Sequence, residues 1–446
     1  MEYLETDYLV VGAGATGMAF VDELLRQNKR ARVILIDRRS KPGGHWVDVY
    51  PFVTLHQPAL FYGVNSEPLG IGPEDLASGS RIKAYFEMVL EKWCHTKRLL
   101  WFPQCDYLGD GRFRSLVASE REYQVKVNMK YVDATYSEIR IPSTHTPNYQ
   151  HSVESKLVPI NHLADLRKAY GQYVVIGAGK TGIDAVIYLL EQGVEAENIC
   201  WIVSNDSWFI VRDFIKPNLF ARELSSQMKV VRGATSYKEL FLGYESGGWF
   251  FRLDKDIWPT KFRCATVSKR EFASLASIHN IVRLGRVKKI EENEIHLENG
   301  CIPTNANTLH VDCTANGLTR RPERPVFDAE TITLQSVVMC QPVFSAAFIA
   351  KIESKYNEQE RKNNMCRPVS HPEHTEDYYS CMLTTYQNAE SWKAMTWWLL
   401  RNRLSFLYHL SLFSHLYLFF TAAFYVKKTF SHMRILSPQS DVSKPK

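Results

Sequence analysis

The fold is decided by the stretch Asp7-Tyr-Leu-Val-Val-Gly-Ala-Gly-Ala-Thr-Gly17, which continues into Arg32-Val-Ile-Leu-Ile-Asp37. An apolar run of buried-strand type is followed at once by a glycine-rich turn and then, over residues 18–27, by apolar side chains at helical spacing. The second apolar strand ends on an acid. Strand, glycine turn, helix, strand and acid in this order predict a Rossmann-type unit that binds a dinucleotide. The alternative is a glycine-rich turn in another α/β fold.

Each part of this first unit has its own role. Gly12 permits the tight turn, Gly14 lets a pyrophosphate approach the backbone, and Gly17 lets helix and strand pack closely. The helix N-terminus faces the phosphates with free N–H groups and a partial positive charge. Asp37 is suited to accept hydrogen bonds from the adenosine ribose. The expected contacts of the first unit are Gly12, Gly14, Ala15, Thr16, Gly17, Asp37 and Arg38.

A second unit of the same kind begins at Tyr173-Val-Val-Ile176 and continues as Gly177-Ala-Gly179-Lys-Thr-Gly182. Residues 183–192 have the pattern of a helix that ends at Gly193, and residues 199–203 form the next apolar strand. Two such units in one chain are far more specific than one. The expected contacts of the second unit are Gly177, Gly179, Lys180, Thr181 and Gly182.

The loop after the first unit contains Gly43-Gly44-His45-Trp46 and then Tyr50-Pro51. In these residues, and in Asp184 after the second glycine motif, the chain resembles the flavin-containing monooxygenases and their Baeyer–Villiger relatives. The resemblance implies that the first unit holds FAD and the second a nicotinamide dinucleotide. It also implies that Gly43, Gly44 and Trp46 lie beside the cofactor. A core aromatic is the alternative reading of Trp46.

The nicotinamide is NADPH or NADH. An arginine after the second strand of the second unit would pair with a 2′-phosphate, but this chain has Ser204-Asn205-Asp206 there. Arg212 and Lys216 lie downstream and are candidates to replace it. The family resemblance favours NADPH.

A later strand, residues 309–313, ends in Thr314-Ala315-Asn316-Gly317, which resembles the element where related chains return to the flavin domain. Gly317 is therefore a candidate FAD contact, and the predicted fold is α/β with two Rossmann-like domains, the second inserted into the first. The expected domains are residues 1–165 (FAD, first part), 166–304 (NAD(P)), 305–400 (FAD, return segment and helices) and 401–446 (apolar helix and polar tail).

These features predict an oxidoreductase that transfers hydride from NAD(P)H to FAD and, by resemblance, oxygenates a small molecule. The alternatives are a flavin reductase or oxidase that inserts no oxygen, and a non-catalytic redox sensor. The Phe-x-Gly-x-x-x-His stretch of the monooxygenases is missing, with His151 its one candidate remnant. His45, His56 and Gln57 lie in the loop expected to approach the flavin, but no residue is assigned a catalytic role.

Charge, the N-terminal sequence and the cysteines limit the partners, location and thiol chemistry to be expected. The net charge of +6 is mild and the basic residues are spread out, so a nucleic-acid partner is not expected. The N-terminus runs directly into a strand without an export leader, and the nine cysteines contain no Cys-x-x-Cys pair. Free thiols, a cytoplasmic location and no dithiol mechanism are therefore expected.

Residues 404–426 are almost entirely apolar or aromatic, with basic residues on both sides. As one helix they would extend about 34 Å, enough to cross a bilayer. Six His, Ser and Thr residues within the stretch also suit a helix that lies on a membrane or docks on the protein. Residues 437–446 are polar and are expected to be disordered.

Overall fold

The computed structural model describes residues 1–317, 319–418, 420, 429 and 431–432. Its first sheet has the strand order β3-β2-β1-β6-β5-β4, and β19 also pairs with β6. The pairs β1–β2, β2–β3, β1–β6 and β6–β19 are parallel, whereas β4 and β5 form an antiparallel edge. The strands are β1 (Glu2–Val11), β2 (Val33–Ile36), β3 (Leu99–Phe102), β4 (Cys105–Gly109), β5 (Arg112–Ser115), β6 (Glu122–Asp133) and β19 (Thr331–Thr333).

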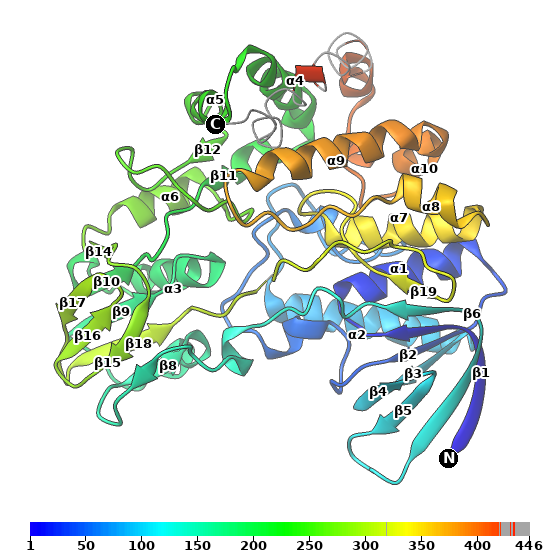
Figure 1. The fold of residues 1–446 in the computed structure, drawn as a ribbon, viewed down its shortest axis with the longest axis horizontal. Coiled ribbons are helices and arrows are strands. Elements are labelled where there is room, and N and C mark those ends of the chain that lie inside the picture. Colours follow the sequence, from blue (N-terminus) through cyan, green and yellow to red (C-terminus); the bar gives the residue numbers. More distant parts are fainter. Residues whose placement is uncertain (318, 419, 421–428, 430, 433–446) are drawn as a thin grey trace, which may run out of the picture.

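The centre of this sheet is apolar because helices cover it. Strand β2 is buried at all four positions, and Val10 lies opposite Leu35 in the register of β1 and β2. Helix α1 (Ala15–Gln27) packs along α7 (Pro342–Lys355), which is far away in the sequence but adjacent in space (Figure 1). Such continuous apolar strands are typical of parallel sheets with helices on their faces. The other helices of this lobe are α2 (Gly79–His95), α8 (Gln359–Met365), α9 (Asp377–Ser391) and α10 (Thr396–Arg401).

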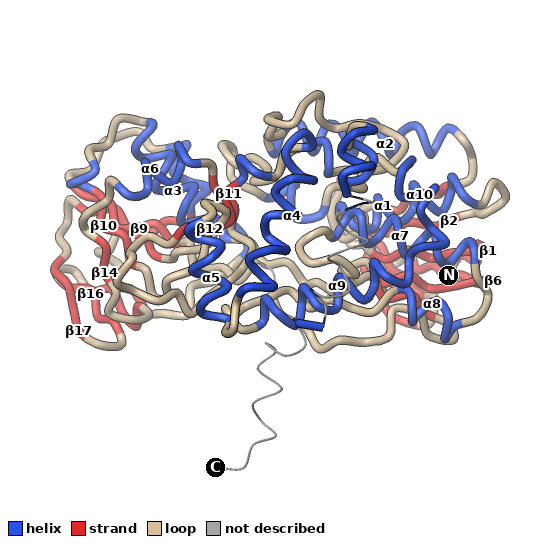
Figure 2. The backbone as a smooth tube through the Cα atoms, turned by 90° about the horizontal axis from the view of Figure 1, so that it is seen from above, coloured by secondary structure: helices blue, strands red, loops and turns tan. Residues whose placement is uncertain are grey.

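The second sheet is entirely parallel, with the order β14-β10-β9-β18-β8. It lies in the opposite lobe of the molecule, with α3 (Lys180–Glu191) and α6 (Lys269–Ala276) beside it (Figures 1 and 2). A smaller sheet of order β17-β16-β15-β7 lies next to it. The strands are β7 (Gln150–His151), β8 (Leu157–Pro159), β9 (Gln172–Ile176), β10 (Ile199–Ile202), β14 (Ile281–Val282), β15 (Val287–Ile290), β16 (Glu294–Leu297), β17 (Gly300–Pro303) and β18 (Thr308–Asp312).

The predicted insertion is confirmed, because β19 returns to the first sheet after the whole second sheet has been formed. Two expected boundaries differ from the sheets. Strands β7 and β8 precede residue 166 yet pair within the second lobe, and β18 follows residue 304 yet pairs with β9. The second lobe therefore runs from β7 to β18. The sheet to which a short strand belongs is decided by the strands with which it pairs, and these are not visible in the neighbouring sequence.

The chain between β10 and β14 forms an aromatic layer. It contains the sheet β12-β11-β13 and helices α4 (Pro217–Gly233) and α5 (Tyr237–Ser246), against which α9 packs. Its buried core includes Trp208, Phe241, Phe262 and Tyr378. The strands are β11 (Phe209–Val211), β12 (Phe250–Phe251) and β13 (Thr266–Val267). This layer connects the second lobe to the C-terminal helices.

Two sequence expectations are wrong. Residues 404–426 do not form one helix, because the chain after α10 makes loops and a short 3-10 turn at Phe406–His409. Part of that stretch lies outside the described residues, as do residues 437–446, and among the described helices none has the length and apolar character to span a bilayer. The nine cysteines are also not all free thiols, since Cys264 and Cys340 form a disulfide.

Candidate dinucleotide sites and the cavity between them

The two glycine motifs fold into closely similar cradles. Gly12 and Gly177 both have left-handed backbones, with φ of +102° and +119°, where glycine is strongly favoured. A β-carbon on Gly17 would overlap the carbonyl oxygen of Gly12, and one on Gly182 would overlap that of Gly177. In each unit the third glycine therefore permits contact between the helix and the turn, as the sequence predicts.

Helices α1 and α3 begin at these cradles in the same way. Gly14 and Gly179 are their N-cap residues, and neither helix has a side-chain hydrogen bond at its cap. A β-carbon on Gly179 would meet no atom within 4 Å, and one on Gly14 would only touch the Gly44 α-carbon at 3.7 Å. Both helix N-termini thus present backbone N–H groups toward open space, which suits a phosphate group.

Asp37 is held at the end of β2 by backbone donors. Its Oδ2 accepts a 2.7 Å hydrogen bond from Ala13 N, and its Oδ1 accepts a 2.8 Å bond from Arg39 N. The side chain is buried but lines the cavity described below. Each carboxylate oxygen has further lone pairs for ribose hydroxyls.

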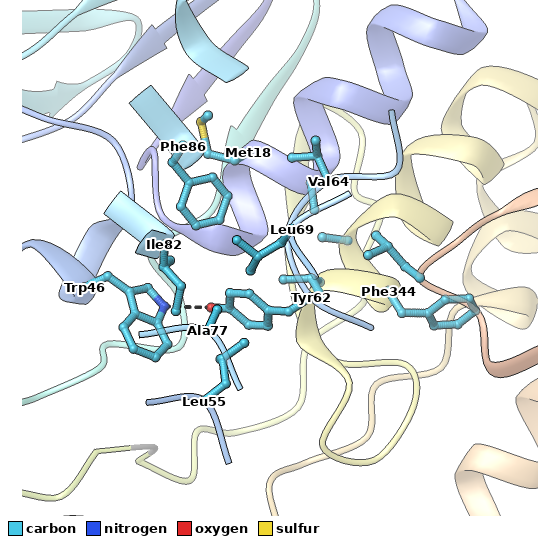
Figure 3. Close-up of a cluster of buried hydrophobic side chains, with 14 of the residues drawn as sticks. Met18, Trp46, Leu55, Tyr62, Val64, Leu69, Ala77, Ile82, Phe86 and Phe344 are labelled. Carbon is cyan, nitrogen blue, oxygen red and sulfur yellow. Dashed lines mark hydrogen bonds between the residues drawn. The ribbon is translucent and has the colours of Figure 1, made fainter. Parts of the chain in front are cut away.

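The Gly43-Gly44 pair packs directly on the first cradle. Gly43 N donates to the Ala13 carbonyl at 2.8 Å, and a β-carbon on Gly44 would approach the Gly14 α-carbon to 2.9 Å. Trp46 is buried next to it, and its indole N–H donates a 2.8 Å hydrogen bond to Tyr62 Oη (Figure 3). Trp46 is therefore both a core aromatic and a residue of the cavity wall.

The loop that follows connects the first unit to the second. Tyr50 Oη donates a 2.5 Å hydrogen bond to Asp184 Oδ2 on α3, and Asp184 also forms an ion pair with Lys180. Phe52 stacks on Tyr188 of the same helix, with ring centroids 3.8 Å apart. These contacts fix the position of one cradle relative to the other.

One cavity of about 1610 Å³ lies between the two units and is lined by both cradles. Gly17 and Gly182 are not among its lining residues, because they pack behind the cradles. The sequence-predicted residues that line it are Gly12, Gly14, Ala15, Thr16, Asp37, Arg38, Gly44, Trp46, Gly177, Gly179, Lys180, Thr181 and Gly317.

The histidines of the connecting loop also face this cavity. Burial lowers the pKa of His45 to about 4 and that of His56 to about 3, so both imidazoles are neutral at pH 7. His56 Nδ1 is buried without a hydrogen-bond partner among the described residues. His151 instead lies exposed on β7 and is not part of the cavity wall.

Arg212 and Lys216, the two candidates to bind a 2′-phosphate, form ion pairs outside the cavity. Arg212 pairs with Glu271 and Lys216 with Glu74, and neither lines the cavity, although Ser204 and Asn205 do. Asp206 accepts two hydrogen bonds from Arg283. Among the cations that line the cavity, Arg38 and Lys180 were expected from the sequence, whereas others, such as Lys261, Arg263, Arg286 and Lys288, were missed. They come from segments with no recognisable motif.

Comparisons with known proteins agree with this geometry. Residues 10–57 match the family model of an NAD(P)-binding Rossmann-like domain. The uncharacterized protein Rv2000 of Mycobacterium tuberculosis is 42% identical over 423 residues, which cover 91% of this chain and 78% of that protein. The chain belongs to one family with it. This family has a weaker relative in the probable FAD-binding monooxygenase AlmA of Acinetobacter baylyi, 32% identical over 94 residues, or 21% of this chain and 19% of AlmA.

Solved structures show that this chain has the fold of flavin monooxygenases with two dinucleotide-binding domains. Cyclohexanone monooxygenase with bound ε-caprolactone matches with a TM-score of 0.53 and 12% identity, over 99% of this chain and 98% of that one. An oxidized steroid monooxygenase bound to NADP matches with a TM-score of 0.51 and 13% identity, over 78% and 85%. At these identities the likeness concerns the fold.

Proposed function

We propose that the protein is an FAD-dependent oxidoreductase that receives hydride from NADPH and oxygenates a small molecule. One observation carries the proposal, which is that a single cavity is lined by both dinucleotide cradles. Hydride transfer requires the reacting rings of two cofactors to lie in contact, and a shared cavity permits this.

The residues of the cavity fit two dinucleotides. Both helix N-termini are open to a pyrophosphate, and the spaces that β-carbons on Gly14 and Gly179 would enter are free of hard clashes. The unpartnered Nδ1 of His56 offers a hydrogen-bonding group to a polar ligand atom inside the cavity. Bound FAD would supply two-electron acceptance from the nicotinamide and a reduced form that reacts with oxygen.

The protein's own residues would bind and orient the two dinucleotides. Asp37 is positioned to hold the adenosine ribose, and Trp46 offers an indole face beside the first cradle. His45 and His56 can hydrogen-bond a ligand without introducing a charge, since burial keeps both neutral. NADPH is proposed as the donor because a fold relative is bound to NADP, and Arg286 and Lys288 supply cations to the cavity wall.

Two glutamate substitutions test the assignment of the cradles. We expect Gly14→Glu to abolish FAD binding, since its side chain would occupy the pyrophosphate space and repel it. Gly179→Glu should leave FAD bound but prevent its bleaching by NADPH in anaerobic stopped-flow measurements. A Gly14→Glu protein that keeps a full complement of FAD, or normal bleaching of Gly179→Glu, would contradict the respective assignment.

Oxygenation is tested by stoichiometry. NADPH oxidation, oxygen uptake and hydrogen peroxide release are measured together, with and without cyclohexanone and a steroid as trial substrates, because fold relatives are named for these compounds. If the protein oxygenates a substrate, oxygen enters that substrate instead of leaving as peroxide. The amount of peroxide released for each NADPH oxidised should then fall when the substrate is added. Peroxide equal to NADPH under all conditions would identify a non-oxygenating oxidase instead.

A further inference from the structure

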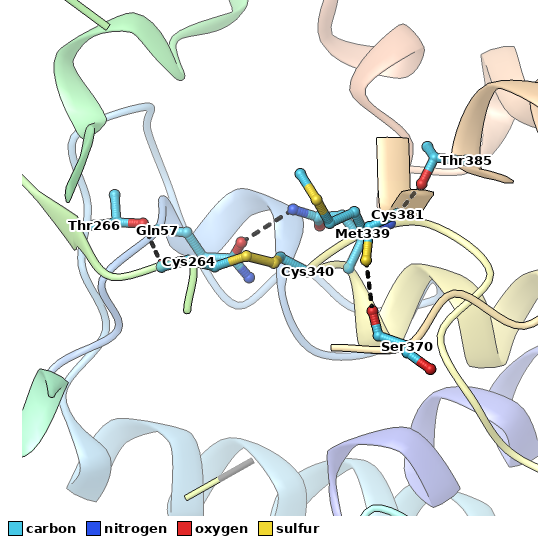
Figure 4. Close-up of a disulfide and its surroundings, with 9 residues drawn as sticks. Gln57, Cys264, Thr266, Met339, Cys340, Ser370, Cys381 and Thr385 are labelled. Atoms are coloured by element: carbon cyan, nitrogen blue, oxygen red, sulfur yellow. Dashed lines mark hydrogen bonds between the residues drawn. A yellow bond between two sulfur atoms is a disulfide. The ribbon is translucent and has the colours of Figure 1, made fainter. Parts of the chain in front are cut away.

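The disulfide between Cys264 and Cys340 lies in the wall of the dinucleotide cavity. Cys264 comes from the segment before β13, in the aromatic layer, and Cys340 from the return segment just before α7. Gln341 Nε2, next to Cys340, donates a 3.2 Å hydrogen bond to Gln57 of the loop that connects the two cradles (Figure 4). The disulfide therefore joins the inserted part of the chain to the first domain at the cavity.

The chain just before Cys264 is also held to the first domain by non-covalent contacts. Lys261 forms an ion pair with Glu373 at 3.1 Å, and Phe262 N donates to the Glu373 carbonyl at 3.1 Å. Thr375 Oγ1 donates a further 2.8 Å hydrogen bond to the Pro259 carbonyl. The segment before Cys264 is thus already joined to the C-terminal part of the first domain by several non-covalent contacts.

The two cysteines also stand apart in their backbone conformation. Cys264 has a φ of +54° and Cys340 a φ of +57°, which places both in the left-handed region that residues with a side chain rarely adopt. Such conformations gather at functional sites, where surrounding structure maintains them. Two cysteines with left-handed backbones that share one disulfide in the cavity wall therefore indicate a functional site at this position.

His371 completes the group. It lines the same cavity, and one of its ring nitrogens lies within 4.8 Å of both sulfur atoms. Burial, with Arg263 adding a repulsive positive charge, lowers the pKa of His371 to about 4. A neutral imidazole at this position is able to hydrogen-bond a cysteine thiol.

We propose that Cys264 and Cys340 form a redox-active pair that accepts two electrons from the NADPH-reduced flavin. The inference rests on the proposed function, because it requires reduced flavin in the cavity. The reaction consumes one NADPH, one proton from solvent and the disulfide, and it yields NADP⁺ and two thiols. NADPH gives up a hydride, which is two electrons and one proton. The two electrons break the S–S bond, and the hydride's proton and the solvent proton complete the two thiols.

Anaerobic titration of the FAD-loaded protein with NADPH tests the pair. The wild type should consume two equivalents of NADPH for each flavin, and the variant Cys264→Ser/Cys340→Ser should consume one. Cys381→Ser is the matched control, because Cys381 is buried nearby as a free thiol and its loss should leave the demand at two. Flavin bleaching in all three proteins reports the proposed function separately from the pair.

Alkylation followed by peptide mass spectrometry gives a second readout that needs no variant. Peptides with Cys264 and Cys340 should be protected before NADPH and labelled after it. The proposal is overturned if both are labelled beforehand, or if they stay protected while the flavin bleaches. It is also overturned if the isolated protein holds stoichiometric zinc, since the two sulfurs and His371 would then be metal ligands. If NADPH fails to bleach the flavin, photoreduction replaces NADPH and the same labelling decides.

Discussion

The hydroxyl of Tyr50 donates a hydrogen bond of 2.5 Å to Oδ2 of Asp184, and this bond joins the loop after the first cradle to the first turns of α3. Tyr50 is buried, and Asp184 also forms an ion pair with Lys180. This bond connects the two dinucleotide units through residues that lie outside both glycine motifs.

Tyr50→Phe removes only the donor. We expect a loss of about 2 kcal/mol in the free energy of unfolding, since a buried hydrogen bond to a charged acceptor contributes about 1.5–3 kcal/mol. Urea unfolding measures it, with Tyr3→Phe as the control because Tyr3 is 77% exposed. Equal stability of the two variants would show that the bond contributes nothing.

The third glycine of each cradle should be far less tolerant than the second. Gly17→Ala and Gly182→Ala place a methyl group on a carbonyl oxygen, so we expect each to cost at least about 2 kcal/mol of stability, as overpacking does. Gly179→Ala enters open space, and Gly14→Ala makes only an ordinary contact. Thermal unfolding of the four cofactor-free variants should separate the two pairs, and a uniform effect would contradict the packing described.

Asp22 gives the protein a specific pH dependence. Burial raises its pKa to about 6 from a usual value near 3.8, although Ser66 donates two hydrogen bonds to it. Because the pKa of Asp22 is higher in the folded than in the unfolded protein, protonated Asp22 stabilises the fold fully below about pH 4. This contribution to the free energy of unfolding is lost as the pH rises through 6. Asp22→Asn should therefore gain stability relative to the wild type between pH 4 and pH 7, by up to about 3 kcal/mol.

Guanidinium unfolding across this pH range checks the Asp22 prediction. Glu120→Gln, at an exposed carboxyl group, is the control and should show a constant difference from the wild type. A constant difference for Asp22→Asn as well would mean that Asp22 is ionised at pH 7 at no cost.

Two truncations test the C-terminal segment. Arg403 is buried and donates to the Leu60 carbonyl at 2.8 Å and the Tyr62 carbonyl at 2.6 Å, so a chain that ends at Asn402 leaves both carbonyls unpaired. We expect that chain to lose several kcal/mol of stability or to aggregate. A chain that ends at Leu410 keeps these contacts and should retain FAD.

Membrane contact through residues 404–426 remains a proposal, now restricted to residues beyond Leu410. Leu412 and Phe413 are 73% and 83% exposed, which is costly in water for large apolar side chains. If this region binds a membrane, ending the chain at Leu410 should move the protein out of the membrane fraction. The full chain and the truncated chain would otherwise fractionate alike.

The glycine motifs made the core of the fold predictable because each position has a local steric reason. Gly12, Gly17 and Asp37 are explained by their own turn, helix and strand, so one sequence is enough to recognise them. Strands β7, β8 and β18 lie across the expected domain boundaries because each joins its sheet through a partner strand that is distant in the sequence.

The contacts between distant segments were not predictable. Cys264 and Cys340 are 76 residues apart, and nothing near either one indicates its partner. His56 and Gln57 line the cavity as their loop suggested, but the neutral state of His56 depends on its burial in the assembled structure, and the partner of Gln57 is Gln341, which is far away in the sequence. Sequence patterns identify what a local backbone needs, whereas charge state and pairing depend on the assembled structure.

The insertion of one lobe within the other sets an order of events during synthesis. Tyr131 of β6 pairs with Thr331 of β19, so 200 residues must leave the ribosome between the two strands. At about 5–20 residues per second this takes about 10–40 s. During that interval the end of β6 is an unpaired strand edge, which is prone to pairing with other chains. We expect the nascent protein to depend on chaperones at this stage, with the inserted lobe folding first and the flavin lobe closing last.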